Sequence, residues 1–406
     1  MNSDFSINLI TRKETATRYF AAGILLVALV SGIASLVHSQ NRSRPESPRA
    51  ASLPASIPTS EFSRIVHDFS EPGGYFQADN FTSNETSYLH VVDKLRELGV
   101  SGGAYVGVGP EQNFTYIAKI HPSIAFIVDI RRQAIIEHLV YKAIFHLAKN
   151  RAEFLSLLFS RPLSKTRAES NGPVKELLKE VLEAPTSPKE YSTNLTTIRQ
   201  TIEDDFQFPL TPEDAQSLAR ICYFFWRFNL GIAYGYGFPT LGDLILETDL
   251  QGREGNFLTR EQDYQYLREF QERNRLIPVV GDFAGTKALT AVANYLRTNG
   301  YTTSAFYTSN VEEYLYQDQV FGRFVDNIRK FPISDRTVFI RAVKGYLGNH
   351  PAWVPGSRMI TLLEKFSVFL ADYRTGLYPD YWSLVTTHYI AGSNPSHKAS
   401  SPPVSR

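Results

Sequence analysis

Short apolar runs alternate with amphipathic runs in the middle of this chain, and this alternation limits the possible fold most. Ala104–Val108 and Ala125–Ile130 have the length and apolar character of buried strands, and a helix is expected to begin near Glu111 between them. Four further strands are predicted at Leu276–Val280, Ser304–Thr308, Thr337–Val343 and Ser383–Ile390. Because parallel strands need a long crossover, this order predicts an α/β fold with a mostly parallel sheet and flanking helices.

The segment between the second and third predicted strands is too long for a simple crossover. A helix from Gln133 carries apolar residues at three- and four-residue spacing, and the residues from about 151 to 275 are mainly helical and irregular in character. We therefore expect one α/β domain over residues 62–392, with a large helical insertion at about 151–275.

Two glycines, Gly107 and Gly109, follow the first predicted strand directly before a helix. Glycine lets the backbone turn tightly and approach a ligand, and the first N–H groups of a helix can bind an anion. Asp129 ends the next strand, where a carboxylate can accept hydrogen bonds from both hydroxyls of a ribose. This arrangement favours a nucleotide-type cofactor site. The alternative is an ordinary turn in which Asp129 pairs with Arg131 or Arg132.

The stretches GGAYVGVGPEQNFTYIAKIHPSIAFIVDIRRQ, PVVGDFAG and FYTSNVEEYL resemble an uncharacterised bacterial family with a Rossmann-like, methyltransferase-type fold. The resemblance covers roughly residues 62–390, and the motifs are similar to those of class I S-adenosylmethionine-dependent methyltransferases. It implies that S-adenosylmethionine is the cofactor and that residues after the fourth strand face the substrate. The implied positions are Gly107 and Gly109 beside the amino-acid part of the cofactor, Asp129 at its ribose, Asp282 at its adenine, and Tyr307 to Asn310 at the substrate.

The sequence departs from the methyltransferase pattern at two positions. Tyr105 stands two residues before the first glycine, where these enzymes usually carry an acid, and Asn113 lies near the place of the missing third glycine. Glu85 or Glu111 could replace the missing acid.

Two other functions remain open. A non-catalytic ligand-binding or scaffold domain could have kept the fold and lost the chemistry. An NAD(P)-dependent oxidoreductase uses the same glycine turn, and there Arg131 and Arg132 would face a 2′-phosphate.

Two further groups of residues are candidates for the site. The turn Gly281–Lys287 resembles a phosphate-binding loop, but its spacing is one residue short and its Lys and Thr are reversed, so we expect only a turn that places Asp282 near the cofactor. Tyr307 and Asn310 could orient a substrate nucleophile as catalytic residues, because both side chains form hydrogen bonds. The alternative for Asn310 is a cap on the helix that begins at Val311.

An uncharged apolar run, Tyr19–Val37, follows an N-terminal tail of residues 1–18. A membrane-spanning helix needs about 20 such residues, so the run predicts a single-pass membrane protein, with a cleaved signal peptide as the rival. Basic residues flank the run on both sides, which leaves the side of the membrane open. Residues 38–61 are expected to be a flexible linker and 393–406 a disordered tail. The net charge of +1 does not indicate nucleic-acid binding.

Overall fold

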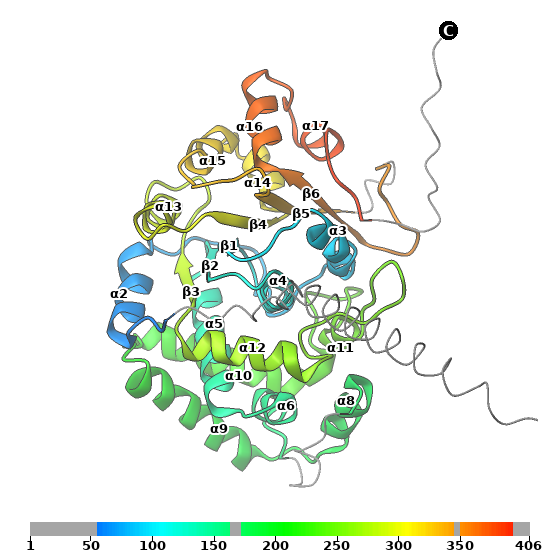
Figure 1. The fold of residues 1–406 in the computed structure, drawn as a ribbon. Coiled ribbons are helices and arrows are strands. Elements are labelled where there is room, and N and C mark those ends of the chain that lie inside the picture. Colours follow the sequence, from blue (N-terminus) through cyan, green and yellow to red (C-terminus); the bar gives the residue numbers. More distant parts are fainter. Residues whose placement is uncertain (1–54, 163–171, 345–349, 393–406) are drawn as a thin grey trace, which may run out of the picture. The chain divides into compact units, whose positions relative to one another are not determined.

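The computed structural model describes residues 55–162, 172–344 and 350–392 (Figure 1). The predicted membrane segment Tyr19–Val37 and the predicted tail 393–406 lie outside these residues. Within the described ranges, no helix is both long and apolar enough to cross a membrane.

The folded domain includes residues that precede the predicted boundary at residue 62. The amide of Ile57 donates a 3.0 Å hydrogen bond to the carbonyl of Arg273, and helix α2 spans Thr59–Phe69. Ile57 and Phe62 are both buried against the domain. The predicted linker, residues 38–61, is therefore wrong at its C-terminal end, because these apolar side chains pack onto the folded body.

Six strands form one sheet in the order β3-β2-β1-β4-β5-β6. Their bounds are β1 Ala104–Gly107, β2 Ile124–Asp129, β3 Leu276–Val280, β4 Thr303–Ser309, β5 Val338–Lys344 and β6 Met359–Lys365. The first five strands pair in parallel, and β6 pairs with β5 antiparallel. A mostly parallel α/β sheet is thus confirmed. This order reverses between β1 and β4, and ligands bind at such a point beyond the carboxyl ends of the strands.

The last predicted strand, Ser383–Ile390, is wrong. Tyr381–Thr386 forms helix α17, because the Asp380 side chain caps it by accepting a hydrogen bond from the amide of Ser383. Only Ile390 makes a strand-like contact, an isolated bridge to Leu363 in β6. Strand β6 was not predicted, and it carries a buried charged residue, Glu364, inside its apolar run.

Helices cover both faces of the sheet (Figure 1). Besides α2 and α17, the described helical elements are η1 Thr86–Leu89, α3 Val92–Glu97, α4 Gln112–Ile120, α5 Arg132–Leu147, α6 Arg151–Phe159, α8 Val174–Glu183, α9 Pro188–Gln200, η2 Thr201–Asp205, α10 Pro212–Phe228, η3 Asn229–Gly231, α11 Leu241–Ile245, α12 Glu261–Glu272, α13 Ala288–Thr298, α14 Val311–Gln317, α15 Phe321–Ile328 and α16 Phe366–Arg374.

The ring contacts of Phe126 in β2 identify one covered face. Phe126 lies 6.3 Å from Phe69 of α2 and 5.7 Å from Tyr295 of α13, measured between ring centroids. Helix α5 packs on β2 and β3 and also on α10 and α12 of the insertion. Because sheet and insertion enclose it, α5 is buried over most of its circumference instead of along one stripe.

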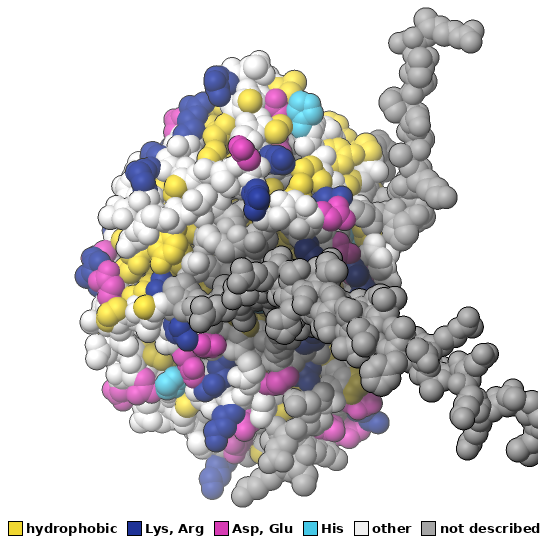
Figure 2. Space-filling view, in the orientation of Figure 1, with side chains coloured by type: hydrophobic (Ala, Val, Ile, Leu, Met, Phe, Trp, Pro, Cys, Tyr) yellow, Lys and Arg dark blue, Asp and Glu magenta, His cyan; other side chains and the backbone are white. Residues whose placement is uncertain are grey.

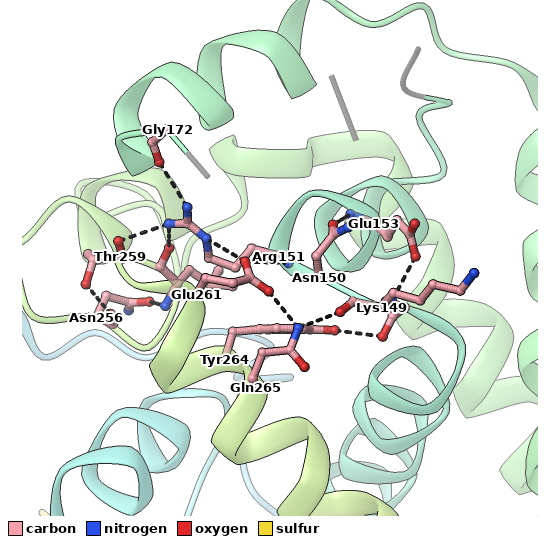
Figure 3. Close-up of polar contacts among 12 residues, drawn as sticks. Lys149, Asn150, Arg151, Glu153, Gly172, Asn256, Thr259, Glu261, Tyr264 and Gln265 are labelled. Atoms are coloured by element: carbon pink, nitrogen blue, oxygen red, sulfur yellow. Dashed lines mark hydrogen bonds and ion pairs between the residues drawn. The ribbon is translucent and has the colours of Figure 1, made fainter. Parts of the chain in front are cut away.

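Helices α6 to α12 occupy the long segment between β2 and β3, as predicted. Arg151, which is 2% exposed, connects several segments of this insertion through hydrogen bonds (Figure 3). Its guanidinium pairs with Glu261 of α12 at 3.1 Å and donates to the carbonyls of Leu258, Thr259 and Gly172 at 2.8–2.9 Å. The insertion is therefore a packed part of the domain.

Candidate functional site

A cavity of about 340 Å³ lies at the carboxyl ends of strands β1 to β4. The sequence-predicted residues that line it are Gly109, Asp129, Asp282, Tyr307 and Asn310. These residues lie at or just after the carboxyl ends of four different strands, which the parallel sheet brings together. Gly107 and Glu111 were also predicted to bind the cofactor, but they are not among the lining residues.

The two glycines of the turn have different roles. Gly109 has a φ of +79°, and a Cβ built there would meet no atom within 4 Å, so this position opens onto the cavity. A Cβ at Gly107 would lie 2.0 Å from Oδ1 of Asn113. Gly107 is therefore needed for the close approach of a protein side chain, which corrects its predicted role in cofactor binding.

Two buried side chains hold the carbonyl groups of the glycine turn. The amide nitrogen of Asn113 lies 2.8–3.1 Å from the carbonyl oxygens of residues 108–110. Nε2 of His138 lies 2.9 Å from the carbonyl oxygen of Gly109. Burial lowers the pKa of His138 to about 4, so the ring is neutral and can donate through Nε2–H. The turn is thus fixed in shape before any ligand binds.

Asp129 is not free at the end of β2. Its carboxylate accepts three hydrogen bonds from Arg131, from the amide and Nε at 2.9 and 3.0 Å and from a terminal guanidinium nitrogen at 2.8 Å. Arg132 points elsewhere and forms two 2.9 Å contacts with Asp214. The alternative drawn from the sequence, in which Asp129 pairs with Arg131, is confirmed. A ribose would have to share this carboxylate with Arg131.

The turn after β3 is filled by the protein's own carboxylate. Glu71 accepts hydrogen bonds from the amides of Asp282, Lys287 and Ala288 at 3.1, 2.7 and 2.8 Å. A Cβ at Gly285 would lie 2.4 Å from a Glu71 oxygen. The amides that a phosphate-binding loop would offer to phosphate are already occupied, while Asp282 itself still lines the cavity as expected.

Glu85 and Glu111, the two candidates for the missing acid, are separated by the structure. Glu85 lines the cavity and is 1% exposed. Glu111 lies behind the loop that carries Glu85 and accepts hydrogen bonds from the Thr82 hydroxyl and the Ser83 amide at 3.0 and 3.3 Å. Burial raises the pKa of both carboxyls, to about 7 for Glu111. Of these two carboxyls, only that of Glu85 can contact a ligand in the cavity.

The end of β4 and the residue after it line the cavity next to Glu85. Ser309 donates a hydrogen bond to Glu85 and has a φ of +52°, which is uncommon for a residue other than glycine. The Tyr307 hydroxyl accepts a 3.1 Å hydrogen bond from Gln112, which also donates to Glu85 at 2.9 Å. Asn310 makes no side-chain cap on α14, so the capping alternative is wrong, and its amide instead donates to Glu313 at 3.2 Å.

Sequence reasoning missed the apolar wall of the cavity. Val311, Tyr314 and Leu315 of α14 line it, together with Phe76 of the segment before η1. The sequence did contain a signal for the three α14 residues. They are spaced to share one side of a helix, and they come directly after a predicted strand, where ligand-binding residues are expected. Phe76 carries no such signal, since its contact with Tyr314 is long-range.

The described part of the chain shows no metal centre, and the one face drawn in Figure 2 shows no concentration of basic side chains. No group of three or more His, Cys, Asp or Glu side chains in the described ranges could hold a metal ion. On the face drawn in Figure 2, Lys and Arg side chains are interspersed with Asp and Glu side chains. That view adds no support for nucleic-acid binding.

Comparison with known proteins assigns a family without a function. Residues 80–222 and 240–371, together more than half of the chain, match a domain of unknown function (DUF7790). No curated protein matches the chain. The matched residues include all six strands, Glu85 and the residues after β4, whereas Phe76 lies outside them. The chain belongs to the DUF7790 family.

Proposed function

We propose that the cavity binds S-adenosylmethionine or a related nucleoside cofactor, and that the domain is a Rossmann-like, methyltransferase-type protein. Support comes from the reversal of strand order between β1 and β4, directly beneath the cavity, and from the open glycine position, Gly109, in its wall. S-adenosylmethionine carries a methyl group on positively charged sulfur, so positioning of a nucleophile is the main task left to the protein.

The charge of the lining carries the proposal. Four acidic residues line the cavity against a single basic one, Arg131, which is already paired with Asp129. The acidic residues are Glu85, Asp129, Asp282 and Asp318. Beyond the Asp129–Arg131 pair, three acidic residues remain in a partly enclosed site. Carboxylates there attract a cationic ligand and repel pyrophosphate, and a cation beside Glu85 favours the ionised form of that buried carboxyl. This favours a sulfonium cofactor over a dinucleotide.

Each lining residue has a role in this proposal. Gly109 lets the cofactor approach the backbone of the turn, and Asp129 accepts a ribose hydroxyl while Arg131 holds it in place. Asp282 accepts a hydrogen bond from the adenine. Glu85 takes the place of the missing acid and binds the ammonium group of the cofactor. Tyr307 supports Glu85 through Gln112, and Asn310 lies at the edge where a substrate would enter.

Membrane attachment through Tyr19–Val37 is a separate part of the proposal. It rests on the length and apolar character of that run. Because S-adenosylmethionine is expected to be cytosolic, an enzyme requires the domain to face the cytosol. A topology reporter fused after Arg406 tests this directly, and an outward-facing signal would contradict the enzymatic proposal.

One observation favours the rival proposal of a non-catalytic binding or scaffold domain. Asp129 already accepts three hydrogen bonds from Arg131, which leaves about one of the roughly four acceptor sites of a carboxylate for a ribose. The NAD(P)-dependent alternative loses support, since Arg131 and Arg132 are both paired with acids and cannot be offered to a 2′-phosphate without breaking an ion pair.

Thermal unfolding of the full-length chain in detergent tests the cofactor class. S-adenosylmethionine and S-adenosylhomocysteine at millimolar concentration should raise the unfolding temperature, because a ligand that binds only the folded state stabilises it. NADPH should not raise it. Glu85→Gln should weaken the effect of S-adenosylmethionine by about tenfold in concentration, as expected for the loss of one charged contact. A shift with NADPH alone would favour the oxidoreductase.

A further inference from the structure

Helix α14 turns an apolar stripe toward the cavity. Val311, Tyr314 and Leu315 are three and four residues apart, so they lie on one side of the helix, and all three line the cavity. The neighbouring residue Glu312 is buried on another side of α14, where it forms a 2.6 Å ion pair with Arg341 of β5. This buried ion pair fixes the rotation of the helix, and with it the apolar stripe.

Aromatic side chains from the segment before η1 add to this apolar wall. The ring of Phe76 lies 5.6 Å from the ring of Tyr314 at an angle of 84°, an edge-to-face contact. Tyr75, which also lines the cavity, is 87% exposed. Large exposed aromatic side chains at a cavity rim can cover the face of a planar ligand at a small cost in conformational entropy.

The polar groups next to the apolar wall are neutral, acidic or already paired. Arg131 lies 5.9 Å from the Phe76 ring centroid, and Lys344 lies 5.4 Å from the Tyr314 ring centroid and pairs with Glu313 at 2.9 Å. Ser309 and Asn310 offer a hydroxyl and an amide, and Glu85 and Asp318 add carboxylates. The one lining cation, Arg131, is held by Asp129 at 2.8 Å. An anionic molecule would therefore meet repulsion without a free counter-charge among the described lining residues, whereas a neutral hydroxyl could form hydrogen bonds.

We infer that this wall binds the second ligand of the site, a small uncharged aromatic molecule with a hydroxyl group at one end. Its ring packs on Tyr314, Phe76 and the apolar stripe, and its hydroxyl points to Ser309 and Asn310. The inference deepens the proposed function, on which it rests, by naming the class of methyl acceptor. It excludes nucleic acids, phosphorylated metabolites and carboxylic acids as acceptors at this site.

Three probes that differ in one property each can test this ligand class. The full-length chain in detergent, saturated with S-adenosylhomocysteine, is titrated with 2-naphthol, 2-naphthoate and decahydro-2-naphthol, and binding is followed by saturation-transfer NMR. We expect 2-naphthol to bind best. The negative charge of 2-naphthoate should weaken its binding at least tenfold relative to 2-naphthol. The loss of the planar ring should weaken the binding of decahydro-2-naphthol about three- to tenfold. Equal or tighter binding of 2-naphthoate would overturn the inference.

Variants at Tyr314 locate the binding site. Tyr314→Leu should weaken 2-naphthol about three- to tenfold, because it removes the ring but keeps an apolar side chain, whereas Tyr314→Phe should bind within twofold of the natural protein. Tyr223→Leu, at a 43% exposed position on α10, is the matched control and should have no effect. Unchanged 2-naphthol binding in Tyr314→Leu places the ligand elsewhere and contradicts the inference.

A separate titration with S-adenosylhomocysteine, without naphthol, separates failure of this inference from failure of the proposed function. If S-adenosylhomocysteine binds and 2-naphthol does not, the acceptor class is wrong and the cofactor proposal survives. If S-adenosylhomocysteine does not bind, the 2-naphthol titration is repeated without it. Binding that depends on Tyr314 then supports the aromatic site alone, and absence of binding contradicts both proposals.

Discussion

The hydroxyl of Tyr105 donates a 2.8 Å hydrogen bond to Oδ1 of Asn113. These are the two positions at which the sequence departs from the methyltransferase pattern, one in the place of the acid and one near the place of the third glycine. The structure joins them into one unit, because Tyr105 orients the amide whose nitrogen contacts the carbonyls of residues 108–110. Gly107 completes the unit by leaving room for Asn113.

Removing the Asn113 amide should destabilise the fold. Asn113→Ala should lower the free energy of unfolding by about 1–3 kcal/mol, because buried carbonyl groups lose their donor, and Tyr105→Phe should lower it by about 0.5–1.5 kcal/mol. Urea unfolding of both variants and of the double variant measures their coupling. Tyr75→Phe, at an 87% exposed position, is the control and should change nothing. Strictly additive effects would show that the two residues do not act as one unit.

Glu111 should make the protein less stable at alkaline pH. Burial raises its pKa from 4.5 to about 7, so its contribution to stability is complete below pH 4.5 and is lost as the pH rises through 7. Glu111→Gln should therefore gain stability relative to the natural protein by about 2–3 kcal/mol between pH 5 and pH 8. Denaturant unfolding over that range measures the gain. Glu213→Gln, on the exposed side of α10, should show none, and a parallel pH profile in Glu111→Gln would refute the assignment.

Lys142 should have the opposite pH dependence. Burial between Phe62 and Phe206 lowers its pKa from 10.5 to about 7, so the folded state is penalised for holding the charge, and stability from this group rises between pH 7 and 10.5. The stability of Lys142→Met relative to the natural protein should fall by about 2–3 kcal/mol between pH 6.5 and pH 9. Lys179→Met, at a 76% exposed side chain, serves as control. A pH-independent difference would contradict the buried charge.

The cavity residues at the carboxyl ends of the strands were predictable because the patterns that identify them are local in the sequence. Asp129 and Asp282 each end an apolar run, and parallel pairing brings such positions together without any knowledge of the packing. Gly109 was found in the same way. Gly107 was assigned the wrong partner, because nothing in a Gly-x-Gly pattern shows whether a ligand or a side chain approaches it.

The remaining site features depend on contacts between distant segments. Glu71 fills the turn after β3 from the segment following α2, and Glu85 reaches β4 from the loop before η1. Glu85 and Glu111 are equal candidates in the sequence, since only packing decides which side of the loop each carboxyl occupies. The prediction of a strand at Ser383–Ile390 was wrong for a different reason. The helix cap formed by Asp380 outweighed the strand preference of the β-branched residues in this segment.

Two glycines with similar backbones allow a direct test of the cofactor site. Gly109 and Gly102 have φ angles of +79° and +64°, and a Cβ at either would meet nothing within 4 Å. Alanine should therefore strain both turns similarly. Only Gly109 lines the cavity, whereas Gly102 precedes β1 at the other end of the strand.

The decisive measurement is a calorimetric titration of the full-length chain with S-adenosylmethionine in the natural protein and both variants. We expect S-adenosylmethionine to bind the natural protein, to bind Gly109→Ala at least tenfold more weakly, and to bind Gly102→Ala within twofold of the natural protein. Absence of heat with both S-adenosylmethionine and S-adenosylhomocysteine at millimolar concentration, or equal affinity in Gly109→Ala, would contradict the cofactor proposal.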